Sequence, residues 1–166
     1  MKSIQMRKTI LITGASSGIG RACAIYFQQQ GWQVAATMRQ PEKETELTRL
    51  ANVKLYQLDV QDTMSINTAI AQAIKDFGII NVVLNNAGYG ARGAFEASTR
   101  EQFVRQFDVN VFGIMSVTQA LLPHFRENKT GIIINISSIL GRTSFPFYSL
   151  YHASKWAVEG FTEGLR

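Results

Sequence analysis

The chain has 166 residues, of which 46% are hydrophobic and 17% charged, and this composition is typical of a globular protein that can bury a core. Its apolar runs are far too short to cross a membrane, and its single cysteine, Cys23, excludes an internal disulfide framework and suits a reducing compartment. The net charge of +5 comes from scattered lysines and arginines without a basic run, so we expect no nucleic-acid partner. From the short apolar runs and the single cysteine we expect no membrane association and a cytoplasmic location.

Short β-branched runs alternate with longer amphipathic stretches along the chain. Strands are predicted at residues 8–13, 33–38, 53–58, 81–86 and 131–137, and helices at residues 19–30, 42–50, 63–77, 100–128 and from 150 onward. Gly31 and Gly78 fall where helices commonly end in a glycine. The runs at 82–84 and 132–134 are continuously apolar, which predicts strands covered on both faces. Five repeats of strand and helix predict an α/β fold with a doubly wound parallel sheet.

A glycine-rich segment, TGASSGIG, lies between the first predicted strand and the first predicted helix. Its three glycines fit a tight turn, a close approach of the backbone to a pyrophosphate, and close helix–strand packing. Amide groups at the start of the helix would then face the phosphates. Such a loop can also be a purely structural turn, but its position favours a Rossmann-type dinucleotide-binding domain, which would comprise residues 1–166. The candidate cofactor-binding residues here are Gly14, Ser16, Ser17, Gly18, Ile19 and Gly20.

The second predicted strand ends at Met38 and is followed by Arg39. In dinucleotide-binding folds an acidic residue in this region accepts the ribose 2′-hydroxyl of NAD, whereas an arginine accommodates the 2′-phosphate of NADP. No Asp or Glu occurs here before Glu42. Arg39 could be an ordinary surface residue, but the arginine and the missing acid both favour NADP(H) as the cofactor.

The last predicted helix carries the segment YHASK, in which Tyr151 and Lys155 are one helical turn apart. An ammonium group beside a phenol favours the phenolate, so this pair could donate or accept a proton near neutral pH. The alternative is that both residues are simply helix surface. His152 points about 100° away from Tyr151 on a helix, so we interpret it as a bystander. No His, Cys or acidic cluster has metal-ligand spacing, and we therefore expect no metal.

Several motifs, in this order, resemble the short-chain dehydrogenase/reductase family over essentially the whole chain. They are the TGxxxGxG spacing at residues 13–20, NNAG at residues 85–88 and YxxxK at residues 151–155. The glycine spacing is similar to that of the single-domain branch, and residues 138–166 are similar to the hydroxysteroid-dehydrogenase-like group. The resemblance implies hydride transfer between the nicotinamide cofactor and a small-molecule carbonyl or alcohol substrate. The alternative is a non-catalytic nucleotide-binding protein with a regulatory or assembly role.

The resemblance also implies catalytic roles for particular residues. Tyr151 would be the acid/base and Lys155 its activator. Ser138 would hydrogen-bond the substrate oxygen, although it could instead cap the strand end, and its neighbour Ser137 is the rival for the role. Asn110 would hold a water for proton relay, or could simply cap or pack within its helix.

Further implications concern the cofactor, the assembly and the length of the chain. Asp59 would contact the adenine ring, and the remaining implied cofactor contacts are Asn86, Ala87, Gly88, Tyr151 and Lys155. In relatives the two last helices form a dimer surface, so the resemblance implies a homodimer or homotetramer. Apolar residues of these two predicted helices could form that surface or could equally belong to the core: Phe103, Phe107, Val111, Trp156 and Phe161. Family members continue with further strands and a substrate-covering segment, so we expect a domain truncated at its C-terminus.

Overall fold

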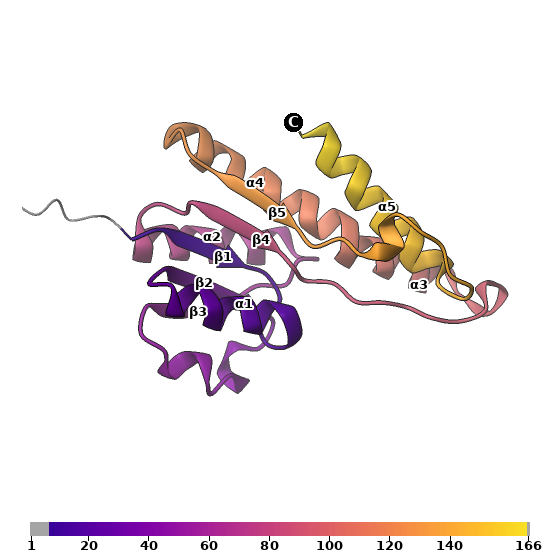
Figure 1. The fold of residues 1–166 in the computed structure, drawn as a ribbon, viewed down its shortest axis with the longest axis horizontal. Helices are drawn as coiled ribbons and strands as arrows, with labels where there is room; N and C mark the ends of the chain where they lie inside the picture. The colour runs from indigo at the N-terminus through magenta and orange to yellow at the C-terminus, as the bar shows by residue number, and fades with distance from the viewer. Residues whose placement is uncertain (1–6, 166) are drawn as a thin grey trace, which may run out of the picture.

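The computed structural model describes residues 7–165 and is built around a parallel sheet (Figure 1). The strands are β1 (Thr9–Ile12), β2 (Gln33–Met38), β3 (Val53–Gln57), β4 (Val82–Asn85) and β5 (Ile132–Asn135). Their order in the sheet is β3-β2-β1-β4-β5, and every neighbouring pair is parallel. The order reverses between β1 and β4, which is where such sheets open a crevice at the carboxyl ends of their strands. The predicted α/β class is confirmed.

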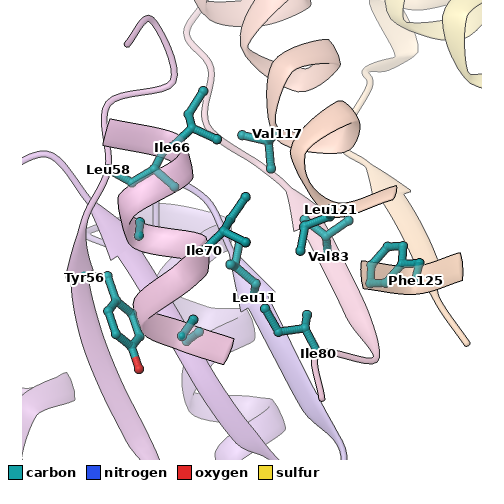
Figure 2. Close-up of a cluster of buried hydrophobic side chains, with 13 residues drawn as sticks. Leu11, Tyr56, Leu58, Ile66, Ile70, Ile80, Val83, Val117, Leu121 and Phe125 are labelled. Atoms are coloured by element: carbon teal, nitrogen blue, oxygen red, sulfur yellow. The ribbon is translucent and has the colours of Figure 1, made fainter. Parts of the chain in front are cut away.

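One face of the sheet is covered by α2 (Thr63–Phe77) and α4 (Gly113–Glu127). Figure 2 shows Ile66 and Ile70 of α2 and Leu121 of α4 packed over Leu11 and Val83 of the sheet. Burying side chains of this size contributes roughly 1.5–3 kcal/mol each. Helix α2 has the predicted bounds, because the Asp62 carboxylate accepts the amides of Met64 and Ser65 at its start and Gly78 ends it with a positive φ of 78°.

The opposite face is covered by α1 (Gly18–Gln29), as Figure 1 shows. Ala24 of this helix packs with Ile10 and Ile12 of β1, which alternate with Leu11 between the two faces. Gly31 follows the helix with a positive φ of 81°, as predicted for a helix end. Helices therefore lie on both faces, and the glycine loop before α1 comes to the carboxyl end of the sheet.

The predicted helix at residues 42–50 is wrong. Two short 3₁₀ helices occupy the segment instead, η1 (Pro41–Lys43) and η2 (Leu47–Arg49). The Glu44 side chain accepts the amides of Glu46 and Leu47, which competes with continuous helical hydrogen bonding. Leu47 is buried against the sheet, so the segment is held by packing and by this carboxylate.

The single helix predicted at residues 100–128 is also wrong. The structure has α3 (Arg100–Phe107), a π-helical turn η4 (Asp108–Phe112) and then α4. A Cβ on Gly113, the first residue of α4, would lie 2.7 Å from the Cβ of Val60. The π-helical turn is therefore followed directly by the close contact between Gly113 and the loop after β3. Asn110 is the central residue of this turn. Turns of this kind are frequent at functional sites.

Helix α5 (Ser149–Gly164) packs on η4 and the start of α4, where Val158 contacts Val111 and Ile114. Figure 1 shows it at the C-terminal end of the chain, in yellow. Next to it, β5 is the last strand of the sheet, and Ile132 and Ile134 are 58% and 38% exposed. The prediction that this strand is covered on both faces is therefore wrong for residues 7–165, since α1 does not reach across to β5; for β4, which is buried throughout, it is confirmed.

Candidate active site

The carboxyl ends of the strands open into a cleft of about 910 Å³. It joins segments that are far apart in the sequence: the glycine loop, the ends of β2, β3, β4 and β5, and α5. The candidate residues that line it are Gly14, Ser16, Ser17, Gly18, Ile19, Arg39, Asp59, Asn86, Ala87, Gly88, Ser138, Tyr151 and Lys155. Two candidates, Gly20 and Asn110, are buried and do not line the cleft.

The glycine loop leaves room for a phosphate group at the start of α1. Gly18 has a positive φ of 55°, and no atom lies within 4 Å of the position that a Cβ would occupy. The Ser17 side chain makes no capping hydrogen bond, and the first turn of α1 has no acidic residue. The amide groups of this turn are therefore available to an anion, as they must be to receive a pyrophosphate.

Close packing holds the loop against the segment after β4. A Cβ on Gly14 would lie 2.9 Å from the Cα of Ala87, and a Cβ on Gly20 would lie 2.5 Å from the carbonyl oxygen of Gly14. The side-chain Nδ2 of Asn86 donates to the backbone carbonyl oxygens of Thr13 (2.9 Å) and Gly14 (3.1 Å). Gly20 thus contributes by packing behind the cleft, while Asn86 fixes the loop in front of it.

Ser138 and Ser137 both line the cleft just after β5. Ser138 caps the short helix η5 (Ile139–Gly141), because its Oγ accepts the amide of Leu140 at 3.1 Å. Ser138 thus caps this 3₁₀ helix, whereas the alternative considered from the sequence was a cap of the strand end. That contact uses the oxygen as an acceptor and leaves the hydroxyl proton to donate, so capping and substrate binding are compatible. The choice of Ser138 over Ser137 stays a prediction.

Tyr151 and Lys155 face the cleft from α5. The Lys155 Nζ lies 5.7 Å from the centre of the Tyr151 ring and donates to the carbonyl oxygen of Ile136 at 2.7 Å. Lys155 is only 5% exposed, and this burial lowers its pKa. An ammonium has three N–H donors, so two remain for other groups in the cleft.

His152, which lies between them, takes part in a different set of contacts. Its Nδ1 is 2.8 Å from the carbonyl oxygen of Leu140, and its Nε2 accepts the amide of Phe145 at 2.8 Å. It is buried and does not line the cleft. Its imidazole therefore ties the loop before α5 to the helix.

Asn110 is fully buried beside the cleft, and its side-chain amide is occupied by the backbone of Tyr89. Its Oδ1 accepts the Tyr89 amide at 3.0 Å, and its Nδ2 donates to the Tyr89 carbonyl oxygen at 2.9 Å. The same nitrogen lies 3.1 Å from the Oγ of Ser154, which donates to the carbonyl oxygen of Tyr151. Asn110 thus connects the loop after β4 to the helix that carries Tyr151.

Sequence reasoning missed several residues of the site. Those at or just after the ends of strands could have been found from the rule that ligands bind there: Met38, Leu58, Val60, Gln61, Tyr89, Gly90 and Ile136. Arg105 and Val109, from α3 and η4, carry no such signal. Thr13 was also missed; its Oγ1 accepts the amides of Asn86 and Ala87, both at 3.0 Å.

Between residues 7 and 165, no helix combines the length and the hydropathy needed to span a membrane. Over the same residues, no group of three or more His, Cys, Asp or Glu side chains is placed to hold a metal ion.

The model of the short chain dehydrogenase family matches residues 8–166. The chain belongs to this family. The resemblance inferred from the glycine loop, NNAG and YxxxK is thereby confirmed. Among curated members, a 3-ketodihydrosphingosine reductase of Bacteroides thetaiotaomicron is 41% identical over 156 residues, and the uncharacterized oxidoreductase YusZ of Bacillus subtilis is 41% identical over 167 residues. These alignments cover 94% and 96% of the chain but only 56% and 59% of the relatives, so the chain spans little more than half of their length.

Solved structures with similar sequences share the fold. One from Streptomyces avermitilis has a TM-score of 0.91 at 39% identity, and the alignment covers 96% of this chain and 59% of that one. ElxO with NADP bound has a TM-score of 0.90 at 36% identity, covering 96% and 67%. A member from Burkholderia phymatum in complex with NAD has a TM-score of 0.88 at 30% identity, covering 96% and 59%.

Proposed function

We propose that this short-chain dehydrogenase transfers a hydride between NADP(H) and a carbonyl or alcohol group of a small molecule. The observation that carries the proposal is the meeting of Ser138, Tyr151 and Lys155 with the glycine loop in one cleft. The uncapped start of α1 and the open space at Gly18 fit a dinucleotide. The bound nicotinamide would supply the hydride chemistry, and the protein would orient it and handle the proton.

In carbonyl reduction, negative charge develops on the substrate oxygen. The Ser138 hydroxyl would donate a hydrogen bond to that oxygen, and the Tyr151 phenol would donate the proton. Lys155 would stabilise the tyrosinate that forms, and its remaining N–H groups would bind ribose hydroxyls. Asp59 would contact the adenine ring, with Asn86, Ala87 and Gly88 along the cofactor. Asn110 would position the loop at Tyr89 and the start of α5; a water held for proton relay stays a prediction.

The preference for NADP(H) rests on Arg39, since the similar solved structures include one complex with NADP and one with NAD. Arg39 lies at the end of β2, lines the cleft and is exposed. The first acidic residue in the chain after β2 is Glu42, so no carboxylate directly follows the strand beside Arg39. A guanidinium there can pair with a 2′-phosphate.

The Arg39→Ala variant should bind NADPH about 10- to 100-fold more weakly, because a hydrogen bond to a charged group is lost, while NADH affinity should change less than about twofold. Isothermal titration calorimetry with both cofactors measures the difference. Arg49→Ala, an exposed arginine of η2 that does not line the cleft, is the matched control and should bind like the unaltered protein. Equal losses for both cofactors in Arg39→Ala would remove Arg39 from the phosphate site.

We also propose a homodimer or homotetramer. Of the apolar residues considered for the interface, Val111 belongs to the core, Phe107 and Phe161 are partly buried against it, and Trp156 of α5 is 54% exposed. Val104 of α3 and Phe112 of η4 are exposed as well, although sequence reasoning had not named them. An indole on a helix surface is a common anchor of protein–protein interfaces.

The Trp156→Glu variant should therefore shift the protein towards the monomer in sedimentation velocity at micromolar concentration, because a charge would be buried in the interface. Gln72→Glu, which adds the same charge at an exposed position of α2, should leave the assembly unchanged. An unaltered protein that sediments only as a monomer would contradict the proposal.

A further inference from the structure

The segment after β5 carries Ser138 and then leads back to α5. Ser138 is followed by the short helix η5 and by residues 142–148, which connect it to α5. Residues 142–147 are all exposed, so packing does little to fix this part of the chain. Hydrogen bonds to the rest of the fold therefore have to hold Ser138 at the cleft that it shares with Tyr151.

One buried side chain of α5, that of His152, reaches this segment without lining the cleft. It is 8% exposed, and its Nε2 accepts the amide of Phe145 at 2.8 Å, so this nitrogen carries no hydrogen. The carbonyl oxygen of Phe145 lies further from Nε2, at 3.2 Å. In a neutral imidazole the hydrogen is then on Nδ1, which lies 2.8 Å from the carbonyl oxygen of Leu140. The Nδ1–H group therefore donates to Leu140.

Leu140 of η5 connects this imidazole to Ser138. Its amide donates to the Ser138 Oγ at 3.1 Å, and its carbonyl oxygen accepts from His152. A path of two hydrogen bonds, both made by one residue, thus joins the Ser138 hydroxyl to α5. His152 directly follows Tyr151 in the chain, so the path ends beside the proposed proton donor.

An ion pair also joins η5 to α5, but it lies at the surface. The Nη2 of Arg142 is 2.7 Å from the Oε2 of Glu159, and the Arg142 side chain is 69% exposed. Exposed ion pairs contribute little, because water and salt screen them. Loss of the His152 contacts would instead leave two backbone groups without their partners, so His152 is the stronger connection.

We propose that His152 is a positioning residue for Ser138. By holding the carbonyl group of Leu140, it fixes η5 and so directs the Ser138 hydroxyl to the substrate oxygen beside the Tyr151 phenol. The inference rests on the proposed hydride transfer, in which Ser138 donates to that oxygen. It extends the proposed function by naming the side chain that sets the place of Ser138 relative to Tyr151.

Steady-state kinetics of carbonyl reduction test this role. His152→Phe keeps a ring and removes both nitrogens, and it should lower kcat about 10-fold, because a small misplacement of a group that acts in the transition state is costly. The loss should be smaller than the loss of about 10²- to 10³-fold expected when Ser138→Ala removes the donor itself. NADPH affinity should change less than about twofold, since His152 does not line the cleft.

His124 offers a matched control for this experiment. Its Nε2 also accepts a backbone amide, that of Ile80 at 3.1 Å, but it does not line the cleft. His124→Phe should therefore leave kcat unchanged. A loss of kcat in His124→Phe as large as in His152→Phe would overturn the proposal, because any unpaired backbone amide would then have the same effect.

Two conservative variants test the path through Leu140. The new Nδ2 of His152→Asn can donate to the Leu140 carbonyl oxygen, whereas the new Oε1 of His152→Gln can accept the Phe145 amide. His152→Asn should retain kcat within about threefold, and His152→Gln should resemble His152→Phe. A better kcat in His152→Gln than in His152→Asn would overturn the proposal, and this comparison decides alone if circular dichroism shows that His152→Phe does not fold.

A double-variant cycle shows whether His152 acts through Ser138. In the Ser138→Ala background no hydroxyl is left to position, so adding His152→Phe should lower kcat less than about twofold further. A second loss of about 10-fold would overturn the proposal, because His152 would then act by another route.

Amide hydrogen exchange measured by NMR tests the structural part without turnover. The Leu140 amide should exchange about 10-fold faster in His152→Phe than in the unaltered protein, because η5 is released from α5. Unchanged exchange would overturn the path to Ser138. If the unaltered protein reduces no generic aldehyde or ketone, the proposed function is wrong, whatever the exchange rates. If it does and His152→Phe has the same kcat, the proposed function stands and the role of His152 is wrong.

Discussion

Replacing Tyr151 with phenylalanine should lower kcat by about a hundredfold or more, because general acid/base catalysis contributes about 10²- to 10⁴-fold. The substitution keeps the ring that lines the cleft and removes the phenol hydroxyl, which is the group proposed to donate the proton. Affinity for NADPH should change little, since the glycine loop, Arg39 and Lys155 are untouched. Cofactor titration by fluorescence and turnover with a generic aldehyde or secondary alcohol measure the two effects.

Tyr148 offers a matched control for this experiment. It precedes α5, its ring centre lies 6.4 Å from that of Tyr151, and it does not line the cleft. Tyr148→Phe should therefore retain normal turnover. Near-normal turnover in Tyr151→Phe would contradict the mechanism, and the YxxxK segment would then be only part of a helix. Cofactor binding without turnover in the unaltered protein would instead favour a non-catalytic nucleotide-binding protein.

Replacing Lys155 with methionine should impair both chemistry and binding. Methionine retains much of the aliphatic stem, but the ammonium that stabilises the tyrosinate is lost. Oxidation of an alcohol needs the phenolate, so its rate should fall at least about tenfold at neutral pH and recover partly as the pH rises. NADPH should also bind more weakly, because two N–H donors that could reach the ribose are removed.

A pH–rate profile of alcohol oxidation, together with cofactor titration, measures this prediction. The midpoint of the profile should move to higher pH in Lys155→Met. Lys75→Ala, at an exposed lysine of α2, should leave the midpoint in place. A profile with reduced amplitude but an unshifted midpoint would show that Lys155 acts only by packing and by its bond to the Ile136 carbonyl.

Much of the fold follows from local patterns. The helix at residues 63–77 was predicted with its observed bounds, because an aspartate cap, a regular apolar period and a terminal glycine all lie within the segment. Strand β2 also has its predicted bounds, and the other strands differ at their ends by one or two residues. The glycine loop was placed correctly between β1 and α1 because a strand, three glycines and a helix occur in succession.

Contacts between distant residues explain the errors. The segment at 42–50 has helical periodicity, but Glu44 binds the amides of its own turn and pairs with Arg21 of α1. The segment at 100–128 reads as one helix, yet Asn110 binds the backbone of Tyr89, 21 residues away, within a π-helical turn. Neither the pairing of Glu44 with Arg21 nor the binding of Asn110 to Tyr89 could be recognised from the local sequence pattern.

The sequence by itself determined the class of fold, the glycine loop and the residue types of the candidate site, because each depends on spacing within a short segment. Only the tertiary structure decided which of these residues meet. It placed Ser138 and Lys155 in one cleft with the glycine loop, and it buried Asn110 behind that cleft. The physical reason is that these arrangements depend on how strands and helices pack against one another, and on which buried polar groups find partners across the chain.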